Sequence, residues 1–380
     1  MFRRSKRLVV VLAVLVTAVS LSVPAATASP HMLVGLLDEA NTLYGNPDRN
    51  FPILKQLRVQ VLRVNLYWGG RFGVANEKPT DATDPADPAY DWSIYDRTVN
   101  YAAQYGVKML FSIYGTPRWA NKGKGLRYAP AKPSDLQKFA YAAAQRYSGT
   151  FEGEDGRNLP PVRLWTAWNE PNNPIQLSPQ YRKVGGKWVI QSAIDYAKIC
   201  NAVYTGVHSS MISSEKVACG VTSPRGNNAP ATSRPSVSPL AFLRACKKAG
   251  LKRFDAWAHH PYYGKKTESP TYKPGATAVQ LGNIDALVSE VTRLYGAKRI
   301  WITEYAYQTD PPDKLFGVSY AKQAAYLTQA YAIARRNPRI DMMLWFMLRD
   351  DTSPFGWQSG FFTASGKKKP AFAAFQSLPH

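Results

Sequence analysis

Histidine is scarce in this chain, with five residues among 380, and cysteine is scarcer, with three. The histidines are His31, His208, His259, His260 and His380. His259 and His260 are adjacent and would point to opposite faces of a strand, and no Cys-x-x-Cys or His-pair spacing occurs. Because a metal centre needs several such ligands converging on one point, we expect neither a metal nor an organic cofactor.

The cysteines are Cys200, Cys219 and Cys246, so at most one intramolecular disulfide can form and one thiol is left over. Their neighbours are apolar, which suits buried free thiols equally well. The sequence leaves both possibilities open.

Acidic residues are few, with 26 Asp and Glu against 48 Lys and Arg and a net charge of +22. Such a balance favours approach to anionic material, for example an acidic polysaccharide, a cell wall or a membrane surface. Simple solvation of the surface is the alternative explanation. Nucleic acid is not an expected partner, because the basic residues are scattered and no basic helix or RNA-binding aromatic motif is present.

Long hydrophobic runs are absent except for one at the N-terminus, residues 8–23. Basic residues precede it and Ala26-Thr27-Ala28 follows it, which is the pattern of a secretory signal peptide over residues 1–28, cleaved before Ser29. Removing its four positive charges lowers the net charge to about +18. A retained membrane anchor is the alternative. We expect residues 29–380 to be a secreted monomer without membrane attachment.

Eight strand-like segments alternate with helix-like segments along the rest of the chain. Most are short, apolar on both faces and bounded by turn residues, as in a parallel sheet covered by helices. The repetition predicts one (β/α)₈ TIM barrel over residues 29–380, of class α/β. The expected strands are 33–37, 61–66, 108–113, 162–167, 216–221, 256–259, 299–303 and 342–347.

Helix starts are recognisable between these strands. Ser134 and Gln137 form a capping-box pattern, and Ser238-Pro239 places a cap residue before a proline at the first helical position. The other expected helices are 92–105, 192–208, 284–295, 320–335 and 370–377.

Loops that follow strands are long, for example 67–90 and 261–282, whereas loops that lead into strands are short, such as 296–298. Barrel enzymes typically carry their long loops on one face of the barrel, and their active sites lie on that face. A two-domain arrangement would need a linker, and segment 222–237 fits better as a mobile wall of a cleft.

Two glutamates follow strands at this elaborated face. Glu170 lies in Trp168-Asn169-Glu170-Pro171-Asn172, directly after strand 162–167, and Glu304 follows strand 299–303. A carboxyl pair at one barrel mouth is typical of glycosidic bond cleavage, in which one acid protonates the leaving oxygen while the other attacks or activates water.

An attacking carboxylate needs a nearby cation and a hydroxyl donor to stay ionised. Arg63 lies inside the apolar strand 61–66, and Tyr262 follows strand 256–259. These two residues could supply the cation and the hydroxyl. A salt bridge that only braces the barrel, and plain packing, are the structural alternatives.

Together these features resemble the retaining glycoside hydrolases of clan A, especially families 5 and 39, over nearly the whole of residues 29–380. Family 5 members usually carry a histidine after strand three, where this chain has Ser112-Ile113-Tyr114, so family 39 or an unclassified relative is favoured. The resemblance implies that Glu170 is the acid/base and Glu304 the nucleophile. It also implies that Asn169 binds the sugar 2-hydroxyl, that Trp345 is the platform beneath the sugar, and that Arg63, His260 and Tyr262 belong to the site.

The predicted function is therefore retaining hydrolysis of a polysaccharide or oligosaccharide, similar to a cellulase, a xylosidase or a hydrolase of uronides, with an anionic carbohydrate as one candidate. Retention requires carboxyl groups about 5 to 5.5 Å apart, against roughly 6.5 to 9.5 Å for inversion. Trp68, Trp119 and Trp357 are candidate sugar platforms or plain core residues. A non-catalytic carbohydrate-binding barrel and a metal-dependent hydrolase are the alternatives.

Overall fold

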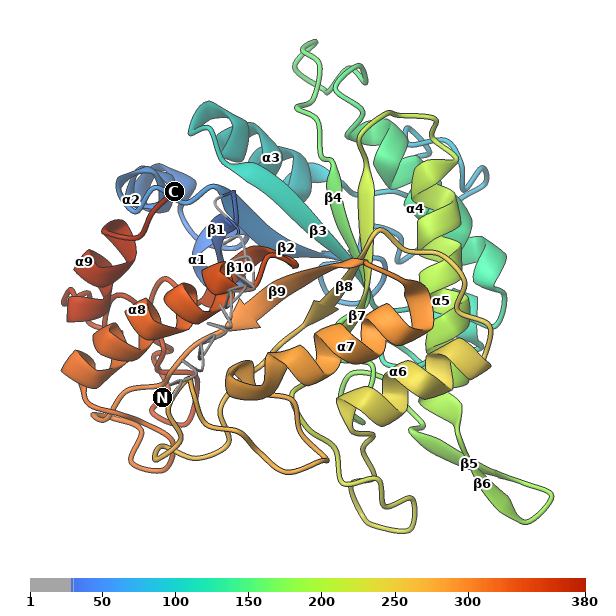
Figure 1. Cartoon of the computed structure of the whole chain (residues 1–380). Helices are drawn as coiled ribbons and strands as arrows, with labels where there is room; N and C mark the ends of the chain where they lie inside the picture. Colours follow the sequence, from blue (N-terminus) through green and yellow to red (C-terminus); the bar gives the residue numbers. More distant parts are fainter. Residues whose placement is uncertain (1–28, 30) are drawn as a thin grey trace, which may run out of the picture.

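Eight parallel strands close into a barrel in a computed structural model that describes residue 29 and residues 31–380 (Figure 1). Their order is β1-β10-β9-β8-β7-β4-β3-β2. The predicted (β/α)₈ barrel is confirmed, while the predicted signal peptide lies outside the described residues. The barrel strands are β1 (Leu33–Leu37), β2 (Val61–Tyr67), β3 (Lys108–Tyr114), β4 (Leu164–Ala167), β7 (Lys216–Thr222), β8 (Ala256–His259), β9 (Arg299–Tyr305) and β10 (Ile340–Phe346).

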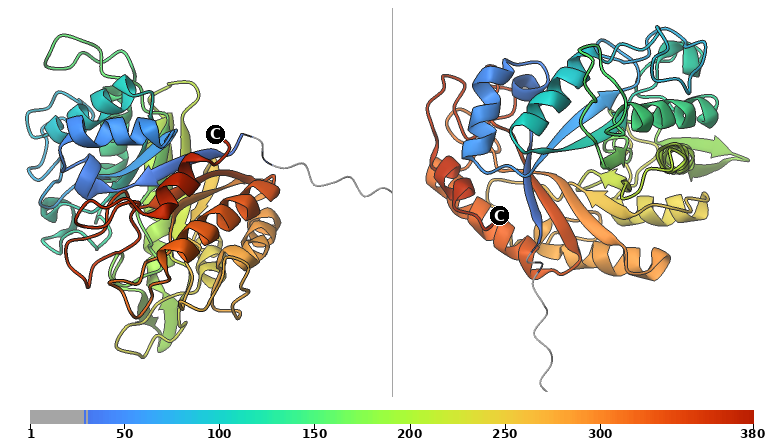
Figure 2. Two further views of the ribbon diagram at one scale, coloured as in Figure 1. Left: turned by 90° about the vertical axis from the view of Figure 1, so that its left-hand side faces the viewer. Right: turned by 90° about the horizontal axis from the view of Figure 1, so that it is seen from above.

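Helices surround the barrel on its outside, as the view from above shows (Figure 2). None of the helices in the described part of the chain is long and apolar enough to cross a bilayer. The helices are α1 (Glu39–Thr42), α2 (Pro47–Gln56), α3 (Ser93–Gln104), α4 (Pro133–Arg146), α5 (Gln191–His208), α6 (Pro239–Lys248), α7 (Ile284–Tyr295), α8 (Tyr320–Arg336) and α9 (Pro370–Gln376), with short 3₁₀ helices η1 (Arg118–Asn121) and η2 (Leu281–Asn283).

Two hydrophobic clusters follow from the alternation of side chains along the strands. The smaller cluster fills the barrel interior, where Trp301 and Leu344 pack beside the small residues Ala218 and Ala258. The larger cluster joins the outer faces of the strands to the helices and includes Trp345. Neighbouring residues of one strand therefore belong to different layers.

The predicted capping box at Ser134 is wrong. Helix α4 begins at Pro133, its cap residue is Lys132, and no side chain caps its first turn. Proline is well suited to this first position because its fixed φ angle matches the helix and its missing N–H would be unsatisfied there anyway.

A hairpin that was not predicted projects beside the mouth of the barrel, between β4 and α5 (Figure 1). Its antiparallel strands are β5 (Tyr181–Val184) and β6 (Lys187–Ile190). Gly185 and Gly186 form the turn with φ values of 54° and 77°. Such a Gly-Gly pair between two strand-forming runs is a hairpin signal that the sequence offered.

The cysteines combine both possibilities that the sequence left open. Cys200 on α5 and Cys219 on β7 form a disulfide, and Cys246 on α6 is a buried free thiol. The disulfide ties a covering helix to a barrel strand.

Candidate active site

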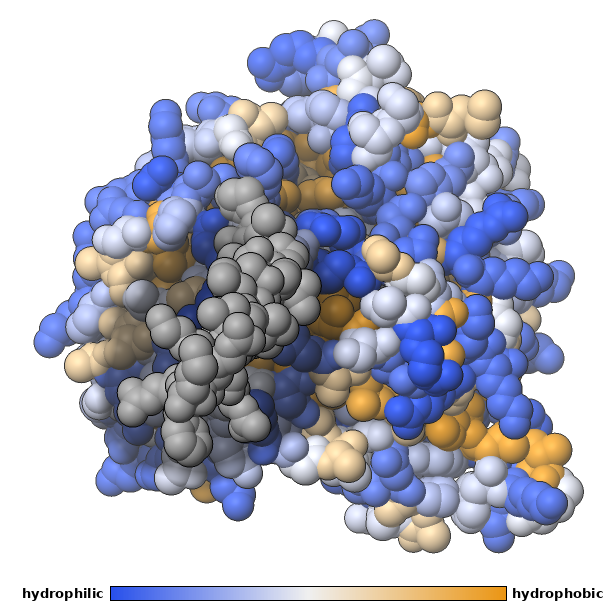
Figure 3. All heavy atoms as spheres, viewed as in Figure 1, coloured by the Kyte–Doolittle hydropathy of each residue, from blue (hydrophilic) through white to orange (hydrophobic). Residues whose placement is uncertain are grey.

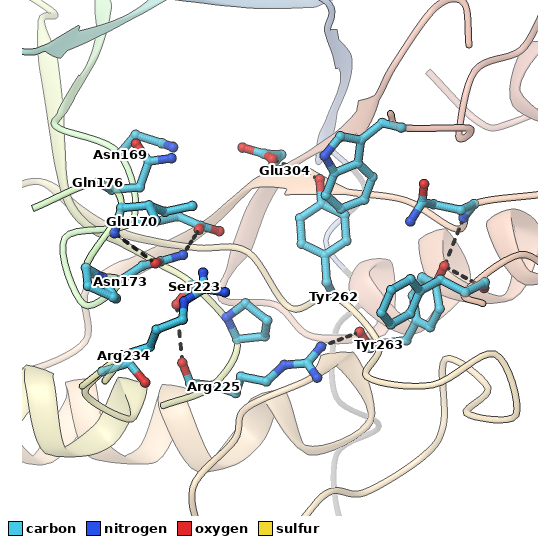
Figure 4. A pocket seen from close by; sticks show the side chains of 17 residues that line it. Asn169, Glu170, Asn173, Gln176, Ser223, Arg225, Arg234, Tyr262, Tyr263 and Glu304 are labelled. Atoms are coloured by element: carbon cyan, nitrogen blue, oxygen red, sulfur yellow. Dashed lines mark hydrogen bonds between the residues drawn. The ribbon is translucent and has the colours of Figure 1, made fainter. Parts of the chain in front are cut away.

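The two predicted acids, Glu170 and Glu304, face one cavity of about 560 Å³ at the mouth of the barrel (Figure 4). Its walls come from the loops that follow β4, β7, β8 and β9, together with the loop after β10 that carries Trp357. The long loops therefore gather at the face where the carboxyl ends of the strands meet.

The backbone around Glu170 is held in an uncommon conformation. Trp168 and Glu170 have φ values of 70° and 38°, in the left-handed region that non-glycine residues rarely adopt. Hydrogen bonds from Trp168 N to Ile113 O (2.8 Å) and from Glu170 N to Val221 O (2.9 Å) fix the turn to β3 and to β7. Strain of this kind persists where the surroundings enforce it, and it is found often at functional sites.

The carboxyl of Glu170 lies among neutral hydrogen-bond partners. Its Oε1 is 3.1 Å from His260 Nδ1, and its Oε2 accepts from Asn173 Nδ2 at 3.2 Å. Burial raises the pKa of Glu170 to about 7, although Asn173 and the more distant charges of Arg63 and Arg225 oppose the rise. Near neutral pH a large fraction of Glu170 therefore carries the proton that a general acid donates.

The carboxylate of Glu304, in contrast, contacts a cation and a hydroxyl. Arg63 Nη1 donates to Oε2 at 3.0 Å, and Tyr262 Oη donates to Oε1 at 2.9 Å. Burial keeps the pKa of Tyr262 well above its ordinary value, so this hydroxyl keeps its proton. Charge-assisted hydrogen bonds of this kind stabilise an ionised carboxylate.

Arg63 is fully buried, and each of its nitrogens has a partner. Nε donates to Ser112 Oγ (2.8 Å), Nη1 donates to Thr303 O (3.1 Å) as well as to Glu304, and Nη2 donates to Asn169 Oδ1 (2.7 Å). A buried charge is tolerated only when it is paired in this way. Because Asn169 accepts through its oxygen, its amide nitrogen is free to donate to a ligand in the cavity that this residue lines.

The buried ring of His260 contacts both acids. Burial lowers its pKa to about 3, so the ring is neutral. Its Nε2 is 3.1 Å from Arg63 Nη1 and 3.0 Å from Thr303 Oγ1. A guanidinium cannot accept a hydrogen bond, so Nε2 must be the acceptor and Nδ1 carries the proton. Nδ1 lies 3.1 Å from Glu170 Oε1 and 3.5 Å from Glu304 Oε2.

This arrangement makes His260 a positioning residue, because its side chain is fully buried and lies outside the cavity lining. The structure therefore corrects the expectation that His260 contacts substrate directly.

Three of the four predicted sugar platforms lie away from the cavity, and this is a second correction. Trp345 is fully buried; its indole N–H donates to Ser359 O (2.9 Å), and its ring stacks on Phe361. Trp68 is 1% exposed and packs against Trp119, whose indole N–H donates to Ala75 O (2.8 Å). None of the three tryptophans lines the cavity. For Trp345 the reason is side-chain alternation, which turns it towards the helices.

Trp357 is the tryptophan that does line the cavity. It is 38% exposed, and its ring centroid lies 5.3 Å from that of Tyr262. An exposed aromatic face beside the reacting groups suits the apolar face of a sugar ring.

Several further wall residues were missed from sequence, among them Asn173, Arg225 and Arg234. All three lie in loops after β4 or β7, where the only available signal was loop length. Among residue 29 and residues 31–380, no group of three or more His, Cys, Asp or Glu is placed to hold a metal ion.

Part of the chain that builds this face of the barrel matches a known family model. Residues 229–375, which include His260, Tyr262 and Glu304, match the family model described as glycosyl hydrolase catalytic core. No match was found among curated proteins.

Several solved structures share the barrel. A family 39 glycoside hydrolase from Bacteroides cellulosilyticus WH2 is 17% identical with a TM-score of 0.62, over 92% of this chain and 64% of that one. A glucosidase from Croceicoccus marinus is 15% identical (TM-score 0.65; 92% and 67%), and a fungal β-1,4-galactanase is 14% identical (TM-score 0.55; 91% and 99%). The chain thus spans 64% and 67% of the length of the first two enzymes. The glycoside hydrolase resemblance found in the sequence is confirmed at this level: residues 229–375 match a glycosyl hydrolase catalytic core, and the chain shares the (β/α)₈ barrel of these solved enzymes.

Proposed function

We propose that this protein is a retaining glycosidase that hydrolyses O-glycosidic bonds of a polysaccharide or oligosaccharide. The spacing of the acids carries the proposal. Glu170 Oε1 and Glu304 Oε2 lie 3.1 and 3.5 Å from the same nitrogen of His260, so these two oxygens are separated by at most the sum, about 6.6 Å. This ceiling is compatible with the retaining separation of about 5 to 5.5 Å.

The two surroundings supply the two roles. In the first step Glu304 attacks the anomeric carbon, the bond to the leaving oxygen breaks, and Glu170 gives its proton to that oxygen. A covalent glycosyl ester of Glu304 forms. In the second step the ionised Glu170 takes a proton from water, the water oxygen attacks the anomeric carbon, and the ester bond breaks to regenerate Glu304.

The neighbouring groups act on charge and position. Arg63 and Tyr262 hold the carboxylate of Glu304 in place for attack, and Arg63 also fixes the amide of Asn169. Asn169 would then donate from its nitrogen to the sugar 2-hydroxyl, where hydrogen bonding strengthens in the transition state. His260 contacts both carboxyl groups through one ring nitrogen and so fixes their positions relative to each other.

Three properties of the working enzyme belong to the same proposal. The chain is exported by residues 1–28, it acts as a monomer free of the membrane, and its substrate is an anionic carbohydrate. The basic and then apolar N-terminus supports export, and the net charge of +22 supports an acidic substrate. N-terminal sequencing of the secreted protein and light scattering test the first two properties.

Substitution of the two acids tests the reaction. We expect Glu304→Ala and Glu170→Gln each to lower kcat on a cleavable aryl glycoside by about a thousandfold or more. Exposed Glu154→Gln, far from the mouth, is the matched control and should act like the wild type. Proton NMR of the first product should show the anomer of the substrate. Release of the opposite anomer, or normal turnover by Glu304→Ala, would overturn the proposal.

A further inference from the structure

Three inserts at the mouth of the barrel contain basic residues and no acidic ones. They are residues 115–132 after β3, residues 171–190 after the acid/base motif, and residues 223–238 after β7, and together they hold ten basic residues. All ten are exposed, and none takes part in an ion pair within the described residues. The ten are Arg118, Lys122, Lys124, Arg127, Lys132, Arg182, Lys183, Lys187, Arg225 and Arg234.

These inserts touch one another and form one continuous wall. Ser178 N donates to Arg127 O (2.8 Å), which joins the first insert to the second. Tyr181 Oη donates to Ser236 O (3.4 Å), which joins the second to the third. Positive charge that forms no ion pair within the described residues therefore extends along one side of the mouth.

The wall lines two adjoining cavities. Arg225 and Arg234 line the cavity that holds the two acids, and Arg118, Lys124 and Arg127 line a second cavity of about 610 Å³. Ile175, which is 52% exposed, belongs to the lining of both. Among the residues that the structure describes, the only acidic side chains lining either cavity are Glu170 and Glu304.

Charge of this kind is not general to the mouth. The insert after β2, residues 68–92, has five acidic and two basic residues. All four of its aspartates accept from the backbone N–H two residues further on, as Asp84 does from Ala86 (2.9 Å), so these carboxylates stabilise turns. In the basic wall, Arg225 is anchored by one hydrogen bond to Tyr263 O (2.8 Å) and keeps its other donors free.

The exposed basic residues of the wall lie outside the immediate contacts of the two acids. Arg63, the cation in contact with Glu304, is fully buried with all its nitrogens engaged, so it cannot reach a substituent on the substrate. The cations that line the cavity with the two acids, Arg225 and Arg234, belong to the wall, and Arg225 is close enough to lower the pKa of Glu170. Acidic groups would therefore be bound on units beside the cleavage point.

The hairpin extends the wall outwards. Trp188 is 45% exposed, and Lys183 Nζ lies 5.1 Å from its ring centroid. Figure 3 shows hydrophobic beside hydrophilic surface at the lower right, where Figure 1 places the β5–β6 hairpin. An aromatic face next to a cation suits a sugar ring that carries an acidic group.

We propose that the substrate is a carbohydrate polymer with carboxylate or sulfate groups, which the three basic inserts bind on units flanking the bond that Glu170 and Glu304 cleave. The inference rests on the proposed glycosidase function. It adds to that function the position of the substrate charge and the residues that recognise it.

Binding to matched polymers tests this inference. The full chain carrying Glu304→Gln is run through gels that contain carboxymethyl cellulose or hydroxyethyl cellulose, and dextran sulfate or dextran. We expect at least about tenfold tighter binding to the charged member of one pair at physiological salt, weakening as salt screens the contacts. Preference within the first pair indicates carboxylate, and preference within the second indicates sulfate.

Charge removal separates the wall from net charge. Arg118→Gln/Lys124→Gln/Arg127→Gln should lower affinity for the preferred polymer about tenfold. Lys216→Gln/Lys248→Gln/Lys252→Gln removes the same charge from exposed sites at the opposite end of the barrel and should change it less than twofold. Equal binding to charged and neutral polymers, or equal losses in the two triple variants, would overturn the inference.

Cleavage is scored separately on neutral aryl glycosides with the wild-type chain. If these are hydrolysed but no charged polymer is preferred, only the inference about substrate charge fails. If charged polymers bind through the wall but no glycoside is hydrolysed, the glycosidase proposal fails instead.

Discussion

Glu170 and Glu304 are identical side chains at one barrel mouth, yet their surroundings differ in almost every respect. Glu170 faces Asn173 and a neutral His260, and burial raises its pKa to about 7. Glu304 faces the guanidinium of Arg63 and the hydroxyl of Tyr262. Burial around one carboxyl, and a cation with a hydroxyl beside the other, are differences of the kind that let one residue type act both as acid and as nucleophile.

The backbone separates the two acids as well. Glu304 lies within strand β9, whereas Glu170 follows β4 in a left-handed conformation that Val221 O helps to hold. A strand position follows directly from sequence periodicity, but the left-handed turn depends on a contact with another strand.

Loss of Arg63, the cation that distinguishes the surroundings of Glu304 from those of Glu170, should have the largest effect on kcat. Arg63→Met removes a charged donor from Glu304 and leaves Asn169 Oδ1 without its partner, so we expect kcat to fall by about a thousandfold. Arg63→Lys keeps the charge and should retain more activity. Thermal melts of both variants separate a catalytic loss from unfolding. A kcat within tenfold of the wild type in a folded Arg63→Met would contradict the assignment of this cation.

Loss of the hydroxyl beside Glu304 should have the next largest effect. Tyr262→Phe removes one hydrogen bond to a charged group, worth about 1.5 to 3 kcal/mol, so we expect kcat to fall roughly 10- to 100-fold. Tyr307→Phe is the matched control, because that buried hydroxyl donates to Glu268 O. Steady-state kinetics of both variants provide the measurement, and equal losses in the two would refute a specific role for Tyr262.

Much of this site could be predicted because it is built on strand ends. Arg63 and Glu304 lie in strands, Glu170 and Tyr262 lie three residues after strand ends, and a parallel barrel brings such positions to one mouth. The structure brings all four together. Trp345 shows the limit of this reasoning, because a shift of one residue along a strand moves a side chain from one layer to the other.

The sequence predicted that long loops are present at the mouth but not how they fold. Arg225 and Arg234 lie in a segment that the sequence predicted as a cleft wall, but their position over Glu170 depends on contacts with distant segments, such as Arg225 with Tyr263 O. Loop conformation depends on long-range packing that local propensity does not encode. The β5–β6 hairpin was the exception, since Gly185-Gly186 was a readable signal.

The raised pKa of Glu170 should also affect stability. A carboxyl whose pKa is higher in the folded than in the unfolded state contributes stability that is fully present below about pH 4.5 and is lost as the pH rises through about 7. Glu170→Gln stays neutral, so at pH 8 it should exceed the wild type in free energy of unfolding by up to about 3 kcal/mol, and at pH 4 by little. Denaturant unfolding at both pH values measures the difference. Glu39 and Glu215, whose pKa values are also raised to about 7, are present in both proteins and cancel. A gain that is the same at both pH values would contradict the protonation assigned to Glu170.

The smallest expected effect comes from Arg225, an exposed cation that lines the same cavity as Glu170. Because protonated Glu170 is the acid, kcat/KM should fall as the pH rises through about 7. The charge of Arg225 lowers the pKa of Glu170, so Arg225→Gln should move this alkaline limb to higher pH. Since Arg225 is exposed and screened by salt, we expect a shift of less than about one pH unit, larger at low ionic strength. A pH profile of kcat/KM at two salt concentrations provides the measurement. A shift to lower pH would contradict the role of Glu170 as the acid, because loss of a positive charge can only favour its protonated form.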